Sequence, residues 1–100
     1  MFDFNSIYEV VKKIPAGKVM TYQGVATKAG NPKGSRVVGN ALHKNKDRSL
    51  IPCHRVVNRN GNLSNSYAFG GITAQRNILE KENVIFKDER TVNLEISLLK

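Results

Sequence analysis

Hydrophobic residues recur at helical spacing in the first segment of the chain. From Phe2 to Ile14, an apolar side chain returns at every third or fourth position. These side chains are Phe4, Ile7, Val10, Val11 and Ile14. The period predicts an amphipathic helix with one buried face. Asp3 or Asn5 can cap its first turn, and Pro15-Ala16-Gly17 predicts its end.

Two more helices are predicted between Thr21 and Lys44. Thr21 is a good N-cap for a helix over Tyr22–Ala29, which Gly30 would end. After a turn, Ser35 can cap a third helix that runs to His43 or Lys44. The residues expected to pack inward from the third helix are Val37, Val38, Ala41 and Leu42. This order has the spacing of a helix-turn-helix, although small helical bundles built only for packing show the same rhythm.

The second half of the chain mixes strand and helix signals. Lys44–Leu50 is polar and predicts a loop, and Val56-Val57 and Asn62-Leu63 flank an Asn-Gly pair that favours a hairpin turn. Thr73 can cap a helix that runs through Glu82, with Ile78 and Leu79 inward. Two segments of strand character follow, Val84-Ile85-Phe86 and Val92–Ile96. The expected fold is mainly α, helix-turn-helix or winged-helix-like, with a short β-hairpin.

Length and charge narrow the class of protein. A chain of 100 residues that is 40% hydrophobic predicts one domain, residues 1–100. One cysteine excludes an internal disulfide, and no histidine–cysteine spacing suggests a zinc site. The sequence has no signal-peptide pattern and no apolar run of membrane-spanning length, so we expect a cytoplasmic protein that does not bind a membrane. A net charge of +8 favours a polyanionic partner, although many small domains are basic merely to stay dispersed.

The sole cysteine lies in the run Ile51-Pro52-Cys53-His54-Arg55-Val56-Val57. An ordinary thiol, with a pKa of roughly 8.5, is only slightly ionised at neutral pH and needs a nearby base to become a nucleophile. His54 is such a base, and basic residues crowd the middle third of the chain around Cys53. Composition alone favours a small buried hydrophobic residue, which is what free cysteines often are, and it is the neighbourhood of Cys53 that favours a nucleophile.

Four blocks of sequence together resemble one family. They are residues 19–26 (VMTYQGVA), 29–33 (AGNPK), 36–42 (RVVGNAL) and 51–57 (IPCHRVV). In this order they resemble the C-terminal domain of the methylated-DNA–protein-cysteine methyltransferases, the O6-alkylguanine-DNA alkyltransferases. The resemblance covers about Phe4 to Val84, and its most specific part is the Pro-Cys-His-Arg-Val run.

The resemblance implies a role for each matching residue. Cys53 is the alkyl acceptor, His54 the general base through a bound water, Glu82 the carboxylate that orients His54, and Asn45 the residue that supports the active-site turn. Tyr22 lies at the flipped nucleotide, and Arg36 replaces the extruded base in the stack. The other residues implied to contact substrate or DNA are Ala41 and Leu42 on the minor-groove helix, together with Arg55, Val56, Tyr67, Phe69 and Gly70.

The function implied is repair of O6-alkylguanine in double-stranded DNA, bound through the minor groove by a monomer. The alkyl group moves irreversibly to Cys53, and neither a cofactor nor a metal is needed. Alkyltransferase-like proteins of the same fold bind such lesions without an acceptor cysteine, so a non-catalytic lesion sensor is the alternative. We expect a single domain without the N-terminal domain that most members of the family carry. This chain also departs from the family pattern in a longer 65–71 loop, in Gln75 where many members have lysine, and in Asn83 where glycine is common.

Overall fold

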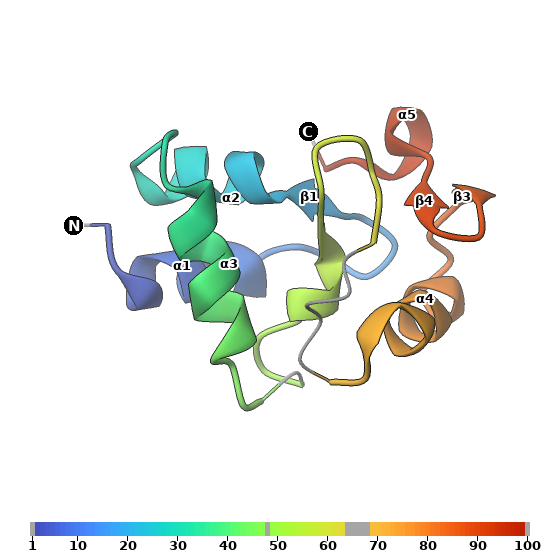
Figure 1. The fold of residues 1–100 in the computed structure, drawn as a ribbon, viewed down its shortest axis with the longest axis horizontal. Helices are drawn as coiled ribbons and strands as arrows, with labels where there is room; N and C mark the ends of the chain where they lie inside the picture. Colours follow the sequence, from blue (N-terminus) through green and yellow to red (C-terminus); the bar gives the residue numbers. More distant parts are fainter. Residues whose placement is uncertain (1, 48, 64–68, 100) are drawn as a thin grey trace.

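The computed structural model describes residues 2–47, 49–63 and 69–99. Three helices form the N-terminal half: α1 (Phe4–Lys12), α2 (Tyr22–Ala29) and α3 (Ser35–His43), each in contact with the other two (Figure 1). The second half contains a 3-10 turn η1 (Cys53–Arg55) and helix α4 (Gly71–Lys81), with α5 (Leu94–Ser97) near the C-terminus. The mainly helical class is confirmed.

Asp3, one of the two predicted caps, caps the first turn of helix α1, and the helix ends at Lys12, before the predicted stop at Pro15. The Asp3 carboxylate accepts from the backbone N–H of Ser6 at 2.9 Å, and the Ser6 hydroxyl accepts from Asp3 N at 2.9 Å. This reciprocal capping box fixes the helix start at Phe4. Ile7 and Val11 are buried as predicted, and Ile14 is buried just beyond the end of the helix.

Helix α2 has the predicted bounds, and α3 departs from prediction at its start. The Thr21 hydroxyl accepts from Gly24 N at 3.0 Å, and Gly30 ends α2 at φ 112°, a conformation that favours glycine. Ser35 as a cap is wrong, because Ser35 is already helical and Gly34 takes the cap position without a side-chain bond. Val37 as an inward residue is also wrong: it is 37% exposed.

The predicted hairpin after Cys53 is wrong, because Val56 and Val57 pair with a distant strand. Strand β1 (Met20–Thr21) pairs in parallel with β2 (Val56–Val57), with Met20 opposite Val56. The Asn-Gly turn still forms, since Gly61 N donates to Asn58 O at 2.8 Å. Beyond the turn, Asn62 bridges Thr91 instead of returning along β2. Both valines are buried, so β2 lies in the interior of the domain.

The C-terminal segment contains the antiparallel hairpin of the fold. Strands β3 (Phe86–Asp88) and β4 (Thr91–Val92) pair, and α5 follows. Thr73 as a cap is wrong, because α4 begins two residues earlier with Gly70 in the cap position. The strand prediction over Val92–Ile96 is right only at Val92, because Asn93 caps α5 through a bond from Glu95 N at 3.1 Å.

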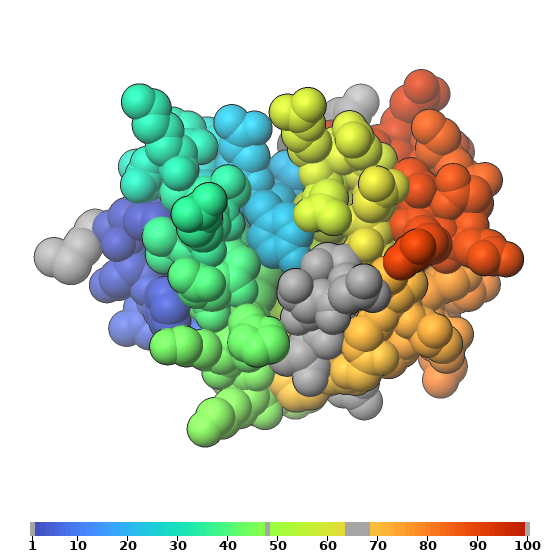
Figure 2. Space-filling model, viewed as in Figure 1, coloured from blue at the N-terminus to red at the C-terminus, as the bar shows by residue number. Residues whose placement is uncertain are grey.

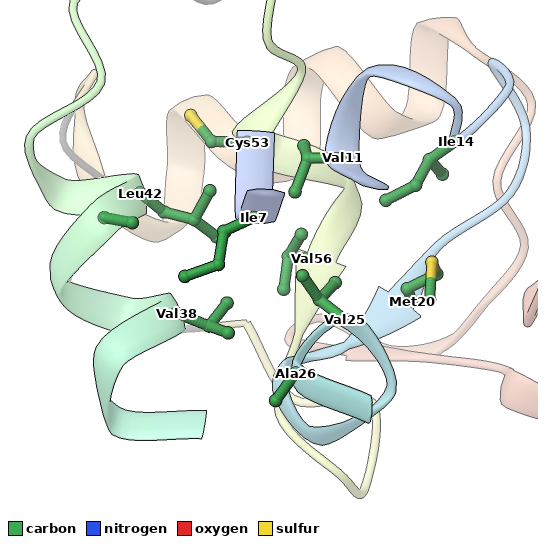
Figure 3. Close-up of a cluster of buried hydrophobic side chains, with 11 residues drawn as sticks. Ile7, Val11, Ile14, Met20, Val25, Ala26, Val38, Leu42, Cys53 and Val56 are labelled. Carbon is green, nitrogen blue, oxygen red and sulfur yellow. The ribbon is translucent and has the colours of Figure 1, made fainter. Parts of the chain in front are cut away.

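The core consists of two clusters of buried side chains. The larger one joins the three N-terminal helices to Cys53 and Val56 (Figure 3). The smaller one joins Val19, Val57 and Leu79 to the C-terminal hairpin. Because β2 contributes Val56 to the larger cluster and Val57 to the smaller one, the segment that carries Cys53 is held between the two halves of the domain. Within the described ranges, none of the helices is long and apolar enough to span a membrane.

Candidate active site

Cys53 begins a tight turn whose backbone is held on both sides. Cys53 N donates to Ile51 O at 2.8 Å, and Arg55 N donates to Pro52 O at 3.0 Å. The chain then enters β2, which is fixed by its pairing with β1. Cys53 and His54 are each only 5% exposed. The thiol therefore lies on a rigid segment of the interior, which limits the positions that the sulfur can adopt.

A cleft of about 900 Å³ reaches Cys53 from the surface. Its walls come from α2, from α3 and from the turn after β2, which lie on the same face of the molecule (Figure 2). In Figure 3 the Cys53 sulfur points away from the packed aliphatic side chains of the core. The cysteine is thus part of the core and also part of the cleft wall, and the interpretation of it as a purely structural residue is not favoured.

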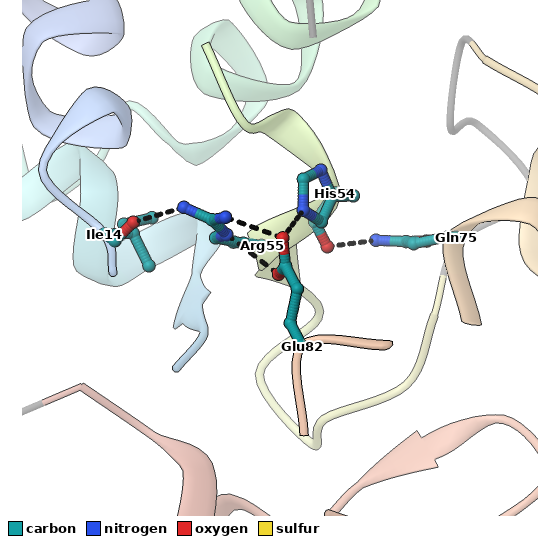
Figure 4. A network of polar contacts seen from close by, with 5 residues as sticks. All are labelled: Ile14, His54, Arg55, Gln75 and Glu82. Atoms are coloured by element: carbon teal, nitrogen blue, oxygen red, sulfur yellow. Dashed lines mark hydrogen bonds and ion pairs between the residues drawn. The ribbon is translucent and has the colours of Figure 1, made fainter. Parts of the chain in front are cut away.

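The side chains of the two residues that follow Cys53 in sequence, His54 and Arg55, meet Glu82 (Figure 4). His54 Nε2 lies 3.0 Å from Glu82 Oε2. The Arg55 guanidinium donates to both carboxylate oxygens of Glu82, at 2.9 and 2.6 Å, and to Ile14 O at 2.7 Å. Such a forked pair is a strong, geometrically specific interaction. The His54–Glu82 pairing implied by the resemblance is therefore present, with a guanidinium added to it.

The environment of Glu82 keeps its carboxyl group ionised. Burial acts to raise the pKa of Glu82, but hydrogen bonds from Arg55 and His54, and their positive charge, outweigh burial and hold this pKa below its ordinary value. A carboxylate at Nε2 favours the histidine tautomer with its proton on that nitrogen. In this tautomer Nδ1 carries no proton, so Nδ1 is the nitrogen of His54 that can accept one.

Asn45 holds the loop that leads into the active-site turn. Its Nδ2 donates to Ile51 O at 2.9 Å, and its Oδ1 accepts from Asp47 N at 3.0 Å. The side chain is 6% exposed. Asn45 therefore contacts the backbone two residues before Cys53 and does not reach the thiol through any of these bonds.

The two residues predicted to handle the flipped base both line the cleft. Tyr22 is the first residue of α2, and Arg36 is the second residue of α3. Leu42 lines the cleft as well. Ala41 does not line the cleft, because it is fully buried and its carbonyl accepts from the Tyr8 hydroxyl at 2.6 Å. The predicted position of Ala41 at the DNA surface is therefore corrected to one in the core. The helical period turns Val38 and Ala41 toward the core and leaves Arg36, Gly39, Asn40 and His43 for the cleft.

Of the remaining predicted contacts, Arg55 and Val56 lie away from the cleft. Arg55 is engaged by Glu82, and Val56 is a core residue that is 1% exposed. Phe69 packs against the larger core cluster, and Gly70 precedes α4 with φ 123°. Tyr67 falls outside the described residues. Direct contact of Arg55 or Val56 side chains with substrate therefore has no support in the geometry.

Several residues near the thiol were missed by the sequence reasoning. Gln23, Asn58, Arg59 and Gln75 line the cleft. Tyr8 lies close enough that burial, and then the charge of Cys53, raise the pKa of its hydroxyl. For Tyr8 a signal existed: it follows Ile7 of the predicted apolar face, so its side chain could be expected at the border of the core. For Gln75 the one signal was its departure from the lysine that many family members have. For Gln23, Asn58 and Arg59, tertiary packing brings them to the cleft. Among the described residues, no group of three His, Cys, Asp or Glu could hold a metal.

The sequence model of the DNA binding domain of 6-O-methylguanine DNA methyltransferase matches residues 3–84. The chain belongs to this family. A curated relative from Rattus norvegicus, named methylated-DNA–protein-cysteine methyltransferase, is 38% identical over 78 residues, which are 78% of this chain and 37% of the relative. The chain spans less than half the length of such curated relatives.

Two solved structures of this family's fold are similar to the chain. S. pombe Atl1, in complex with damaged DNA containing O6-carboxymethylguanine, matches with a TM-score of 0.86 at 33% identity, over 97% of this chain and 94% of Atl1. Mycobacterium tuberculosis O6-methylguanine methyltransferase matches with a TM-score of 0.72 at 32% identity, over 80% of this chain and 47% of that protein. The alkyltransferase domain predicted from four sequence blocks is confirmed as the fold of this chain.

Proposed function

We propose that this chain, acting as one domain and as a monomer, repairs O6-alkylguanine in double-stranded DNA. The alkyl group is transferred irreversibly to Cys53. The observation that carries the proposal is a thiol at the cleft whose neighbour His54 is paired with an ionised Glu82. The names of the curated relatives, and the damaged DNA bound to Atl1, agree with this assignment.

His54, Glu82 and Arg55 make Cys53 nucleophilic. His54 Nδ1 takes the thiol proton, directly or through a water, and becomes an imidazolium. The Glu82 carboxylate stabilises that cation across the 3.0 Å contact. Arg55 fixes both oxygens of Glu82 and keeps it from accepting the proton itself. A proton acceptor beside the thiol favours the thiolate, which is the nucleophilic form of cysteine.

The transfer step is a displacement at the alkyl carbon. The Cys53 sulfur donates an electron pair to that carbon, the bond from carbon to O6 breaks, and its electrons stay on the guanine. The guanine then takes up a proton, for which the Tyr22 hydroxyl is our candidate donor. The products are an unmodified guanine and an S-alkyl cysteine. A thioether has no facile hydrolysis, so each chain reacts once, and the step requires no cofactor.

The alkylated base must leave the duplex before it can reach Cys53. Unstacking and unpairing cost a few kcal/mol, which a side chain filling the gap partly offsets. Arg36 is long, cationic, exposed and at the edge of the cleft, so we assign it this position. Gly39 on the same helix lets the backbone approach a groove floor closely. Minor-groove contact carries little sequence information, which suits inspection of any sequence.

A lesion sensor that binds without transfer is the second candidate. It is favoured by the likeness to Atl1, which extends over nearly the full length of both chains and whose structure is a complex with damaged DNA, because binding of a lesion is all that a sensor requires. The presence of Cys53 beside His54 and Glu82 favours transfer instead, because a sensor needs neither a thiol nor a base next to it. Both candidates use the same cleft.

Intact mass spectrometry distinguishes the two candidates. The protein is incubated with a duplex containing O6-methylguanine, and its mass is recorded beside that of Cys53→Ala. Transfer predicts a gain of one methyl group by the wild type and none by the variant. Tight binding of the damaged duplex without a mass gain would support the sensor, and preference for an undamaged sequence would reject both.

A further inference from the structure

Gln75 connects helix α4 to the active-site turn by two hydrogen bonds. Its Nε2 donates to His54 O at 3.0 Å (Figure 4). The same nitrogen donates to Val56 O at 3.3 Å. The residue is 2% exposed and lines the cleft that reaches Cys53. Reversing the amide would place its oxygen against two carbonyl oxygens, which repel it. The amide orientation is therefore fixed: Nε2 faces the carbonyl groups of His54 and Val56, and Oε1 points away from them.

The oxygen of this amide has no partner among the described residues. Gln75 Oε1 is buried and accepts no hydrogen bond from them. A buried acceptor without a donor bears its full desolvation cost, and such groups in folded proteins call for a functional or solvent explanation. Here the acceptor belongs to a residue of the cleft wall, so a bound molecule with an N–H group is the natural partner.

The chemistry of the substrate determines which N–H group that is. In an O6-alkylated guanine within DNA, N1, N3, N7 and O6 carry no proton, and the exocyclic 2-amine is the only N–H donor of the base. Resting on the proposed function, we propose that Gln75 is a specificity-determining residue whose Oε1 accepts a hydrogen bond from the exocyclic amine of the flipped O6-alkylguanine. Gln75 thereby selects alkylated guanines over alkylated purines that lack the amine.

Two variants separate the acceptor from the donor of Gln75. Gln75→Lys retains N–H groups for His54 O and Val56 O and removes the acceptor. Gln75→Met removes both the acceptor and the donor and has a similar side-chain volume. It replaces the lysine variant in the experiment if Gln75→Lys melts at a much lower temperature than the parent. Gln23→Lys is the matched control, because it adds the same charge to the same cleft at an exposed position. All are made in a Cys53→Ala background, so that binding is measured without transfer.

The readout is the ratio of dissociation constants for two duplexes that differ only in the 2-amine. One contains O6-methylguanine, and the other contains O6-methylhypoxanthine in the same position. Any difference in base-pairing energy between the duplexes is common to all proteins, so only the change in ratio counts. We expect Gln75→Lys to lower the preference for the amine by roughly five- to tenfold, the worth of one hydrogen bond. Gln23→Lys should leave the preference unchanged.

The outcomes separate this inference from the proposed function. An amine preference that is the same in Gln75→Lys and in the parent overturns the acceptor role, as does a parent with no preference, which would mean that a water satisfies Oε1. The proposed function survives either result. In this binding experiment the proposed function fails if the parent binds neither alkylated duplex more tightly than the undamaged one.

Discussion

At the scale of single residues, Glu82 connects the chemistry of the site to the stability of the fold. Its carboxylate takes two hydrogen bonds from Arg55 and one contact from His54, and only 16% of its side chain is exposed. Removing one partner from such a pair leaves a buried charge uncompensated, which costs far more than breaking a surface ion pair. The same carboxylate therefore supports the thiol's base and holds the end of α4 against the active-site turn.

Arg55→Met should destabilise the domain by about 2–3 kcal/mol, somewhat less than for a fully buried pair because some exposure remains. Lys12→Met is the control, since Lys12 pairs at 3.4 Å with Glu9 in an exposed position. We expect that control to stay within about 1 kcal/mol of the parent. Urea unfolding measures both variants. Equal, small losses would show that the Arg55–Glu82 pair contributes little.

The pH dependence of stability should carry the signature of Glu82. The pKa of Glu82 in the folded chain lies below its ordinary value of 4.5. Its stabilising contribution is therefore complete above that value and is lost as the pH falls through the folded pKa. The free energy of unfolding, measured in urea between pH 7 and pH 3, should drop more steeply on acidification in the wild type than in Glu82→Gln. Parallel curves would contradict this assignment.

Arg36→Ala tests base extrusion at the residue scale. If Arg36 fills the gap left by the flipped nucleotide, its loss should slow repair of duplex DNA by at least tenfold, because part of the few kcal/mol of unstacking is no longer offset. The reaction of Cys53 with free O6-methylguanine base needs no extrusion and should change little. Equal losses of rate with both substrates would reject the role.

At the scale of elements, local signals determined which predictions were correct. Helix α2 has its predicted bounds because Thr21 and Gly30 supply a cap and a left-handed end within the segment itself. The pairing of β1 with β2 joins residues far apart in sequence, so the local Asn-Gly signal led to the wrong partner. The same limit applies to the site: the run at Cys53 could be read from sequence, whereas the lining of the cleft by Gln75 depends on packing.

Gly39→Ala separates the stability of α3 from its function. Gly39 lies inside the helix, and a Cβ there would meet no atom within 4 Å, so alanine should stabilise the free chain by about 0.5–1 kcal/mol. The added methyl group would project at the cleft, where we place the DNA. We expect a higher melting temperature together with weaker binding of the alkylated duplex. Unchanged affinity would show that DNA does not approach α3 at this position.

At the scale of the whole molecule, the net charge of +8 and the basic lining of the cleft both favour DNA as the partner. Basic side chains that include Arg36, Lys44 and Arg59 line the cleft. Neutralising phosphates releases counterions, so affinity for a duplex should fall as salt is raised, with a modest slope for a footprint of a few phosphates. Fluorescence anisotropy at increasing salt measures that slope. Affinity independent of salt would count against DNA bound along this basic face.

The fate of the alkyl group tests the proposed transfer to Cys53 most directly. A duplex carrying O6-methylguanine with an isotopically labelled methyl group is mixed with excess protein, and the label is followed into peptides. We predict that the label appears in the peptide that contains Cys53, one per chain at most, while the DNA regains unmodified guanine. Label that stays entirely on the DNA, with the damaged duplex bound, would contradict the central claim and leave this chain as a sensor.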